Sequence, residues 1–323
     1  MGASVRYVIV GAGAVGGVLG ARLHAAGRDV TLVARGEHGS MLQRAGLRLL
    51  TPYGTEVHHI PTVANVAESG LRQGDVLILA VKSQDTATVL EELATCAPTG
   101  LAVVCAQNGV GNEREALRRH QNVYAMCVHL PGVHLRPGIV IQSSTPVPGL
   151  MDVGRYPHGL DAQALALSAD LRAATFDSET DPLVMRRKYR KLLVNLVNAL
   201  DALCGKKARE SPLAAQARAE GAACLTAARI DVAPAISSSR AITVTPQPVA
   251  GHAEAGSSSW QSLARGTGTI EADWLNGEIV MLGRLHGVPT PVNELLQTTV
   301  AQAATAGWQP GAMTVEELSA HLA

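Results

Sequence analysis

The stretch Arg6-Tyr-Val-Ile-Val-Gly-Ala-Gly-Ala-Val-Gly-Gly17 decides the predicted fold, because a short apolar run leads directly into spaced glycines. Gly11 permits a tight turn, Gly13 permits close approach of a pyrophosphate, and Gly16 permits tight packing of a helix on the strand. Amide groups at the start of that helix would face the phosphates. Isolated matches to this motif also arise as ordinary turns, but here a strand precedes it and a helix follows. We therefore predict a dinucleotide-binding loop formed by Gly11, Ala12, Gly13, Ala14, Val15 and Gly16.

The residue after the second predicted strand, residues 29–34, indicates which dinucleotide binds. NAD-binding proteins of this type carry an Asp or Glu there, which accepts hydrogen bonds from the ribose 2′-hydroxyl. This chain has Arg35 instead. A guanidinium offers a planar fork of donors suited to a phosphate, so the sequence predicts NADP(H). The alternative is an exposed, solvated arginine.

Length predicts two domains, the strand and helix patterns predict an α/β protein, and composition excludes several classes of partner. The chain has 323 residues, a formal net charge of +0 and no long basic run, so neither nucleic acid nor a membrane is an expected partner. Its five cysteines lack metal-ligand spacing, so we expect reduced thiols, no metal site and a cytoplasmic location. We expect an N-terminal Rossmann-type NADP-binding domain at residues 1–180 and an all-α substrate and dimerisation domain at 181–323. A homodimer is compatible with this organisation.

Two apolar runs, residues 75–81 and 101–106, are typical of strands buried on both faces of a parallel sheet. Polar residues follow both, and ligands of open parallel sheets bind beyond the carboxyl ends of the strands. Lys82 is thus a candidate contact to a cofactor phosphate or ribose, and Asn108 to the nicotinamide ribose or the substrate. The alternatives are a surface lysine and ordinary Asn-Gly turn chemistry.

Residues 46–60 predict a hairpin around Pro52-Tyr-Gly54, inserted into the α/β pattern. His58 and His59 lie in its second strand. Adjacent strand residues point to opposite faces, so the two rings are poorly placed to chelate one metal ion, and we expect both to be exposed to solvent.

The second half of the chain has helical patterns. Asp181 before Pro182 predicts the start of a long helix that extends to about residue 203. Lys188, Lys191, Asn195 and Asn198 recur along it at three- or four-residue spacing, as either a polar stripe facing a cleft between the domains or a solvated face. Loops are expected at residues 234–259, followed by helices at 269–286, from Pro289 onward and after the capping box at Thr314.

Taken together, these motifs resemble the ketopantoate reductase family, the NADPH-dependent 2-dehydropantoate 2-reductases, over nearly the whole chain. The most specific motifs are Arg190-Lys-Leu-Leu-Val-Asn195 and Glu271-Ala-Asp-Trp-Leu-Asn-Gly277, in this order. The resemblance also rests on the glycine loop with Arg35, Val81-Lys-Ser-Gln84, Gln107-Asn-Gly109, Ser258-Ser-Trp-Gln-Ser-Leu-Ala-Arg265 and Gly287-Val-Pro-Thr-Pro-Val-Asn293.

The resemblance implies that the protein reduces ketopantoate to pantoate, a step of pantothenate biosynthesis. It implies that Lys191 is the general acid and that Glu271 places the substrate and orients the lysine. The implied polar substrate contacts are Asn108, Asn195 and either Ser258 or Ser259. The chemistry agrees, because hydride arriving at a ketone carbon leaves charge on the oxygen, which an ammonium stabilises and protonates.

Some positions depart from the family pattern, and they bear on the substrate. The Asp expected soon after the serine motif is Ser262, and one extra residue precedes Glu271. We therefore expect a 2-oxo acid or related ketone as substrate, with ketopantoate foremost. The alternatives are another carbonyl or imine reductase on the same framework and a non-catalytic NADP-binding regulator, although retention of Lys191 and Glu271 argues against the regulator.

Overall fold

The computed structural model describes residues 5–322 and divides them into two compact units. The first unit extends to Met185 and also includes Ala235–Ala253; the second comprises Arg186–Pro234 and the chain from Glu254 onward. This division differs from the expected one after residue 180, because the segment 235–253 returns to the first unit.

Arg240 explains why that segment belongs to the first unit. Its guanidinium lies 2.8 Å from Asp152, 2.9 Å from Asp177 and 2.9 Å from Glu179. The Asp152 carboxylate is buried, so the guanidinium provides the partner that a buried charge requires. Burial lowers the pKa of Arg240, but Asp152 and Asp177 together outweigh this effect and raise the pKa above its usual value.

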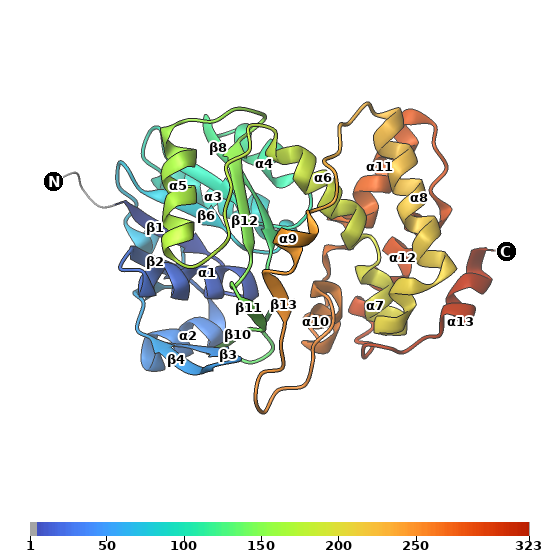
Figure 1. Ribbon diagram of the computed structural model, residues 1–323, viewed down its shortest axis with the longest axis horizontal. Helices are drawn as coiled ribbons and strands as arrows, with labels where there is room; N and C mark the ends of the chain where they lie inside the picture. Colours follow the sequence, from blue (N-terminus) through green and yellow to red (C-terminus); the bar gives the residue numbers. More distant parts are fainter. Residues whose placement is uncertain (1–4, 323) are drawn as a thin grey trace. The chain divides into compact units, whose positions relative to one another are not determined.

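The core of the first unit is a seven-stranded sheet (Figure 1). Six neighbouring strands are parallel and only the edge strand β12 is antiparallel to its neighbour. In spatial order the strands are β12 (Leu150–Arg155), β8 (Asn122–His129), β7 (Ala102–Cys105), β6 (Val76–Leu79), β1 (Arg6–Val10), β2 (Asp29–Val33) and β5 (Thr62–Val63). The predicted apolar runs are therefore buried parallel strands.

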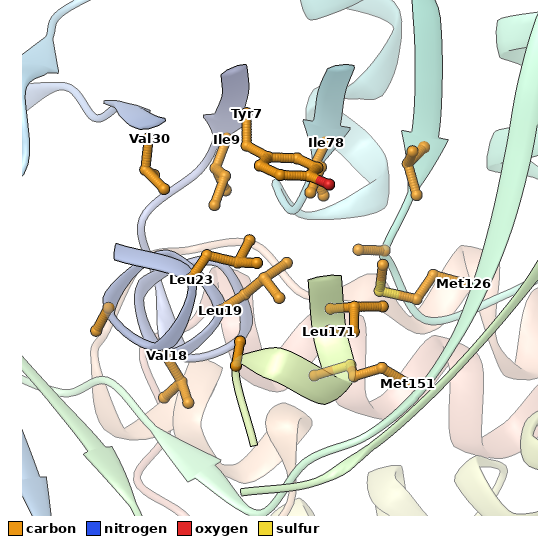
Figure 2. Packing of buried hydrophobic residues seen from close by; sticks show 14 of the residues in the cluster. Tyr7, Ile9, Val18, Leu19, Leu23, Val30, Ile78, Met126, Met151 and Leu171 are labelled. Atoms are coloured by element: carbon orange, nitrogen blue, oxygen red, sulfur yellow. The ribbon is translucent and has the colours of Figure 1, made fainter. Parts of the chain in front are cut away.

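Side chains of β1 alternate between the two faces of this sheet. Tyr7 and Ile9 join Leu19 and Leu23 of a helix after the glycine loop, as Figure 2 shows. Val8 and Val10 join a separate apolar cluster on the other face. The helices of this unit are α1 (Ala14–Ala25), α2 (Gly36–Ala45), α3 (Thr86–Cys96), α4 (Asn112–Leu117), α5 (Ala162–Ala173) and α9 (Ser238–Ala241), with short 3-10 turns η1 (Ala67–Ser69) and η2 (Ser83–Asp85).

The predicted hairpin is confirmed, and it forms part of a separate four-stranded sheet. The order of this sheet is β4 (Gly54–His58), β3 (Leu47–Thr51), β10 (Ile139–Gln142) and β9 (Gly132–Val133). A further pair joins β11 (Ser144–Pro146) to β13 (Val244–Pro246), in a region where we expected only loops.

The expected exposure of both hairpin histidines is wrong for one of them. His59 is exposed, but His58 is buried. The His58 ring meets the edge of His24 of α1, with 6.0 Å between ring centroids, and its Nε2 lies 3.1 Å from Glu56 Oε2. Strand alternation directs the two rings to opposite faces, and α1 covers the face that His58 occupies.

The second unit is helical. Its elements are α6 (Val184–Asn195), which begins in the first unit, α7 (Asn198–Cys204), η3 (Lys206–Glu210), α8 (Pro212–Ala227), α10 (Ser258–Ala264), η4 (Glu271–Trp274), α11 (Asn276–His286), α12 (Pro291–Thr305), α13 (Val315–Ser319) and η5 (Ala320–Leu322). Leu200, Leu213, Leu263 and Leu296, from four of these helices, share one apolar core. The predicted α/β domain followed by an all-α domain is confirmed.

The predicted single helix over residues 182–203 is wrong, because it breaks at Leu196 and Val197 into α6 and α7. At the break, the buried amide of Asn276 donates to the Leu196 carbonyl at 2.9 Å. A helix carbonyl released from its ladder thus finds a partner in a distant residue. Asn198 begins the second helix and so does not continue the polar stripe of α6.

Most ends of the C-terminal helices lie where the sequence predicts them. Gly287, with φ +69°, ends α11, Pro291 begins α12, and Thr314 and Glu317 form the predicted capping box. A continuous helix over residues 269–286 is wrong, since the short turn η4 precedes α11. Among the described helices, none has both the length and the apolar character needed to cross a bilayer.

Candidate active site

The candidate cofactor loops follow the carboxyl ends of neighbouring strands of the large sheet. The Gly11 amide donates to Val33 O at 2.9 Å, and the Ala80 amide donates to Val10 O at 2.8 Å. The strand ends that precede the glycine loop, Arg35 and Lys82 are therefore direct neighbours. In open α/β sheets this edge is where ligands bind, at the point where the strand order reverses, as it does on either side of β1.

The three motif glycines have distinct surroundings. A Cβ on Gly11 would lie 2.8 Å from Val81 N, and Gly11 has φ +99°; a Cβ on Gly16 would lie 2.0 Å from Gly11 O. By contrast, a Cβ on Gly13 would meet only His134 Cδ2 within 4 Å, at 3.9 Å. Gly11 and Gly16 are thus required by the fold, whereas Gly13 leaves open space above the loop. The residues fit a cofactor pyrophosphate there.

Arg35 lies two residues beyond the end of β2, at the N-cap position of α2, as expected for a residue at the adenosine ribose. Its side chain is 68% exposed and pairs with Asp85, with 3.0 Å between Nη2 and Oδ1. Asp85 lies in the turn η2, which Lys82 begins after β6. No sequence pattern indicated this carboxylate beside Arg35.

Lys82 and Asn108 are both partly buried, and a polar network links their two loops. Asn112 donates from Nδ2 to the Asn108 carbonyl and to Ser83 Oγ, at 3.1 Å each. Asn112 Oδ1 accepts from the Thr86 hydroxyl at 2.8 Å. Ser83, Thr86 and Asn112 are buried, so the loops after β6 and β7 are fixed together.

His38 of α2 is a second residue at this edge that no sequence pattern indicated. Its Nε2 donates to Ala12 O at 2.8 Å, and its Nδ1 accepts from the Gly138 amide at 2.9 Å. These partners assign the neutral ring with its proton on Nε2. Burial lowers the pKa of His38, and the contact with Ala12 opposes this effect. The histidine thereby anchors the glycine loop from outside.

In the second unit, α6 carries Lys191 and Asn195 one turn apart. Lys191 is partly buried, Asn195 is 9% exposed, and the rival lysine Lys188 is 4% exposed. A solvated face is therefore the wrong description of this stripe. Buried ammonium and amide groups require polar partners, which marks this helix face as a place of polar chemistry.

The serine motif forms α10, whose first turn contains both candidate serines. Ser257 caps this helix by accepting from the Trp260 amide, and its own amide donates to the buried Asp201 at 2.5 Å. Ser259 is buried and Ser258 partly buried. The Ser258 carbonyl accepts from the Ser262 hydroxyl at 3.0 Å. The side chain at the position of the family's Asp therefore makes its hydrogen bond within its own helix.

Glu271 begins η4 and is only 4% exposed. Arg265 ends α10, and burial lowers the pKa of its guanidinium while the Glu271 charge opposes that shift. The buried carboxylate thus lies within electrostatic reach of a cation. Among residues 5–322, no group of three metal-ligating side chains is arranged to hold a metal ion.

Comparison with known proteins decides the family. The model of the ketopantoate reductase PanE/ApbA family matches residues 7–158, and the model of its C-terminal domain matches residues 183–304. The chain belongs to the ketopantoate reductase family. This confirms the suspected resemblance and the expected class, an NADP-dependent oxidoreductase acting on a keto group, with NADP(H) as its cofactor.

Individual ketopantoate reductases resemble the chain over almost its full length. A 2-dehydropantoate 2-reductase of Archaeoglobus fulgidus is 31% identical over 305 residues, covering 91% of this chain and 96% of its own. A crystal structure of a PanE/ApbA family ketopantoate reductase from Ralstonia eutropha JMP134 is 27% identical with a TM-score of 0.77, covering 94% of this chain and 99% of its own.

A third similar protein shares the fold alone. The ternary structure of D-mandelate dehydrogenase with NADH and anilino(oxo)acetate has a TM-score of 0.78 at 22% identity, covering 94% of this chain and 99% of its own. The roles of individual residues, Lys191 and Arg35 included, stay predictions after these comparisons.

Proposed function

We propose that this ketopantoate reductase family member reduces ketopantoate to pantoate, with NADPH as the hydride donor. The observation that carries the proposal is that both family models match in consecutive parts of one chain. The first range contains the glycine loop and Arg35, and the second contains Lys191 and Glu271. The open position at Gly13 supports a pyrophosphate on the loop.

In this proposal, residues of the first unit bind the cofactor. The glycine loop holds the pyrophosphate, Arg35 and Lys82 contact the adenosine ribose and its phosphate, and Asn108 contacts the nicotinamide ribose or the substrate. Bound NADPH supplies the hydride to the ketone carbon. Tight fixation of the Asn108 loop by Asn112 supports a positioning role for that loop.

On the substrate side, Lys191 donates a proton to the ketone oxygen as charge develops there. Glu271 places the substrate and orients the lysine, and Asn195 with Ser258 or Ser259 supplies polar contacts. The burial of Glu271 and Asn195 supports these roles, because polar groups removed from water interact strongly with charge nearby.

A screen of NADPH oxidation with ketopantoate, other 2-oxo acids and unrelated ketones and imines tests the function. We expect turnover with ketopantoate and slower turnover with some other 2-oxo acids. Brisk reduction of an unrelated ketone or imine without ketopantoate turnover would contradict the proposal. NADPH binding without reduction of any compound would favour the non-catalytic regulator.

A different 2-oxo acid is the second candidate substrate, and Ser262 is the observation that favours it. Where the family pattern has an Asp, this chain has a buried serine whose hydroxyl bonds to Ser258 O. That position offers no carboxylate to a substrate. The same screen separates the two candidates by their ratios of kcat/KM.

We also propose a cytoplasmic location and a homodimer. Five free cysteines, Cys96, Cys105, Cys127, Cys204 and Cys224, support a reducing compartment. Exposed apolar side chains of α11, Met281 and Leu285, support an interface on the second unit. Sedimentation of the purified protein across a concentration series tests the dimer.

A further inference from the structure

The ion pair between Arg35 and Asp85 brings a carboxylate to the guanidinium expected to bind the cofactor's 2′-phosphate. Nη2 and Oδ1 lie 3.0 Å apart, and the two side chains are 68% and 38% exposed. The residues are 50 positions apart in sequence and follow two different strands. Both are therefore accessible to a ligand that occupies this edge of the sheet.

Asp85 has no evident structural duty that explains its carboxylate. It stands at the N-cap position of α3, where aspartate side chains commonly accept from the first amides, yet it makes no such bond. Its backbone amide, not its side chain, closes the turn onto Lys82 O at 2.9 Å. The carboxylate instead points to Arg35.

We propose that Asp85 sets the cofactor preference, because its carboxylate competes with the 2′-phosphate of NADPH for the Arg35 guanidinium. This inference rests on the proposed function only in that Arg35 receives the 2′-phosphate. A phosphate that binds Arg35 must displace this carboxylate or lie beside it, and both are anionic. NADH has a 2′-hydroxyl there and is not subject to this competition. Asp85 thus lowers the preference for NADPH over NADH.

The test is the direct binding of NADPH and NADH, by fluorescence titration, to the full-length protein and to Asp85→Asn. Asparagine keeps the size of the side chain and its preference for the N-cap position, but removes its charge. We expect the Kd of NADPH to fall by about threefold to fivefold, the upper part of the range that an exposed ion pair contributes. The Kd of NADH should stay within about twofold, as expected for contacts of such small energy.

Two further variants make the assignment specific. Asp29→Asn is the matched control: Asp29 is 4.0 Å from Arg72, is exposed and begins β2, at the opposite end of the strand from Arg35. It removes the same charge and should leave both affinities unchanged. In an Arg35→Ala background, which itself weakens NADPH binding, Asp85→Asn should tighten NADPH binding less than it does with Arg35 present, because the competition for the guanidinium is gone and only repulsion between carboxylate and phosphate persists.

The opposing model is that Asp85 holds Arg35 in place for the phosphate. Weaker NADPH binding in Asp85→Asn supports that model and overturns the proposal, and unchanged NADPH binding contradicts both. Equal tightening of NADH, or the same gain in Asp29→Asn, also overturns it, since both indicate a general charge effect. These titrations do not involve turnover, so a protein that binds NADPH but fails to reduce ketopantoate contradicts the proposed function alone. A protein that does not bind NADPH contradicts both.

Discussion

In the first unit the candidate cofactor residues follow the ends of strands, whereas in the second unit the candidate catalytic residues lie on helices and are mostly buried. Arg35 is 68% exposed beside the glycine loop, while Asn195 and Glu271 are 9% and 4% exposed. The candidate cofactor residues of the first unit thus lie at the edge of a sheet. The candidate catalytic residues of the second unit are enclosed among packed helices.

The difference indicates two ways of positioning functional groups. At the sheet edge, the main chain is fixed by the strands, and glycines admit a ligand close to it; single side chains there adjust affinity. Within the helical unit, each polar group is removed from water and depends on particular partners. Substitutions in the second unit should therefore change turnover more than substitutions of exposed cofactor contacts change binding.

The largest expected effect is that of Lys191→Ala. Loss of the general acid should lower kcat by about 10²-fold to 10⁴-fold, while the Kd of NADPH stays nearly unchanged, because the ammonium acts on charge that develops only during hydride transfer. Steady-state kinetics together with cofactor titration measure both quantities.

Lys188→Ala is the matched control for this experiment. Lys188 lies on the same helix and is more buried, so its loss should cost some stability, seen as a lower Tm, but far less turnover. Near-normal turnover in Lys191→Ala would end the assignment. A collapse of turnover confined to folded Lys188→Ala would transfer the role of acid to Lys188.

A smaller effect is expected from methyl groups added to the glycine loop. Two such variants distinguish a glycine needed for ligand binding from one needed for folding of the first unit. Gly13→Ala should fold normally, since φ is −71° and only one atom lies within 4 Å of the added carbon. It should raise the Kd of NADPH by about tenfold or more, because a methyl in a filled site costs about 1–3 kcal/mol.

Gly16→Ala should show the opposite pattern. Its Cβ would lie 2.0 Å from Gly11 O, so the free energy of unfolding of the first unit should fall, by at least about 1–3 kcal/mol for such overpacking. Thermal denaturation and NADPH titration of both variants decide the matter. An unstable Gly13→Ala, or a stable Gly16→Ala that still binds NADPH normally, would contradict the roles assigned to these glycines.

Sequence was a good guide to the first unit because its signals are local. Apolar runs that end in polar residues located β6 and β7, and glycine spacing located the loop before α1. The candidate role of Arg35 was also predicted locally, from its position just after the second strand. Its partner Asp85 was not, because the contact joins two loops 50 residues apart, and no pattern within either loop indicates it.

The errors have the same physical origin. The break between α6 and α7 depends on Asn276, which lies 80 residues beyond the carbonyl that it binds. His58 is buried because α1 covers its face of the hairpin, a packing choice that alternation alone does not specify. The segment 235–253 joins the first unit through Arg240 and carboxylates far from it in sequence. Helix and strand signals predict elements, but such long-range partners decide where elements bend and dock.

The smallest predicted effect concerns the pH dependence of stability and tests whether the sheet edge is also held by buried polar contacts. His38 is neutral when it bridges Ala12 and Gly138, and burial lowers its pKa in the folded protein. In the unfolded chain a histidine takes up a proton near pH 6.5. Protonation therefore favours the unfolded state. The contribution of His38 to the free energy of unfolding is fully present above about pH 6.5 and is lost as pH falls from there toward the lower folded pKa.

His38→Gln removes this titration, so its free energy of unfolding should fall less steeply than that of the wild type below about pH 6.5. Denaturant unfolding of both proteins between about pH 5 and 8 measures the two slopes. Some slope should persist, because burial also lowers the pKa of His58 and His120. If His38→Gln keeps the wild-type slope, His38 does not couple protonation to the anchoring of the glycine loop, and the sheet edge depends on its main chain alone.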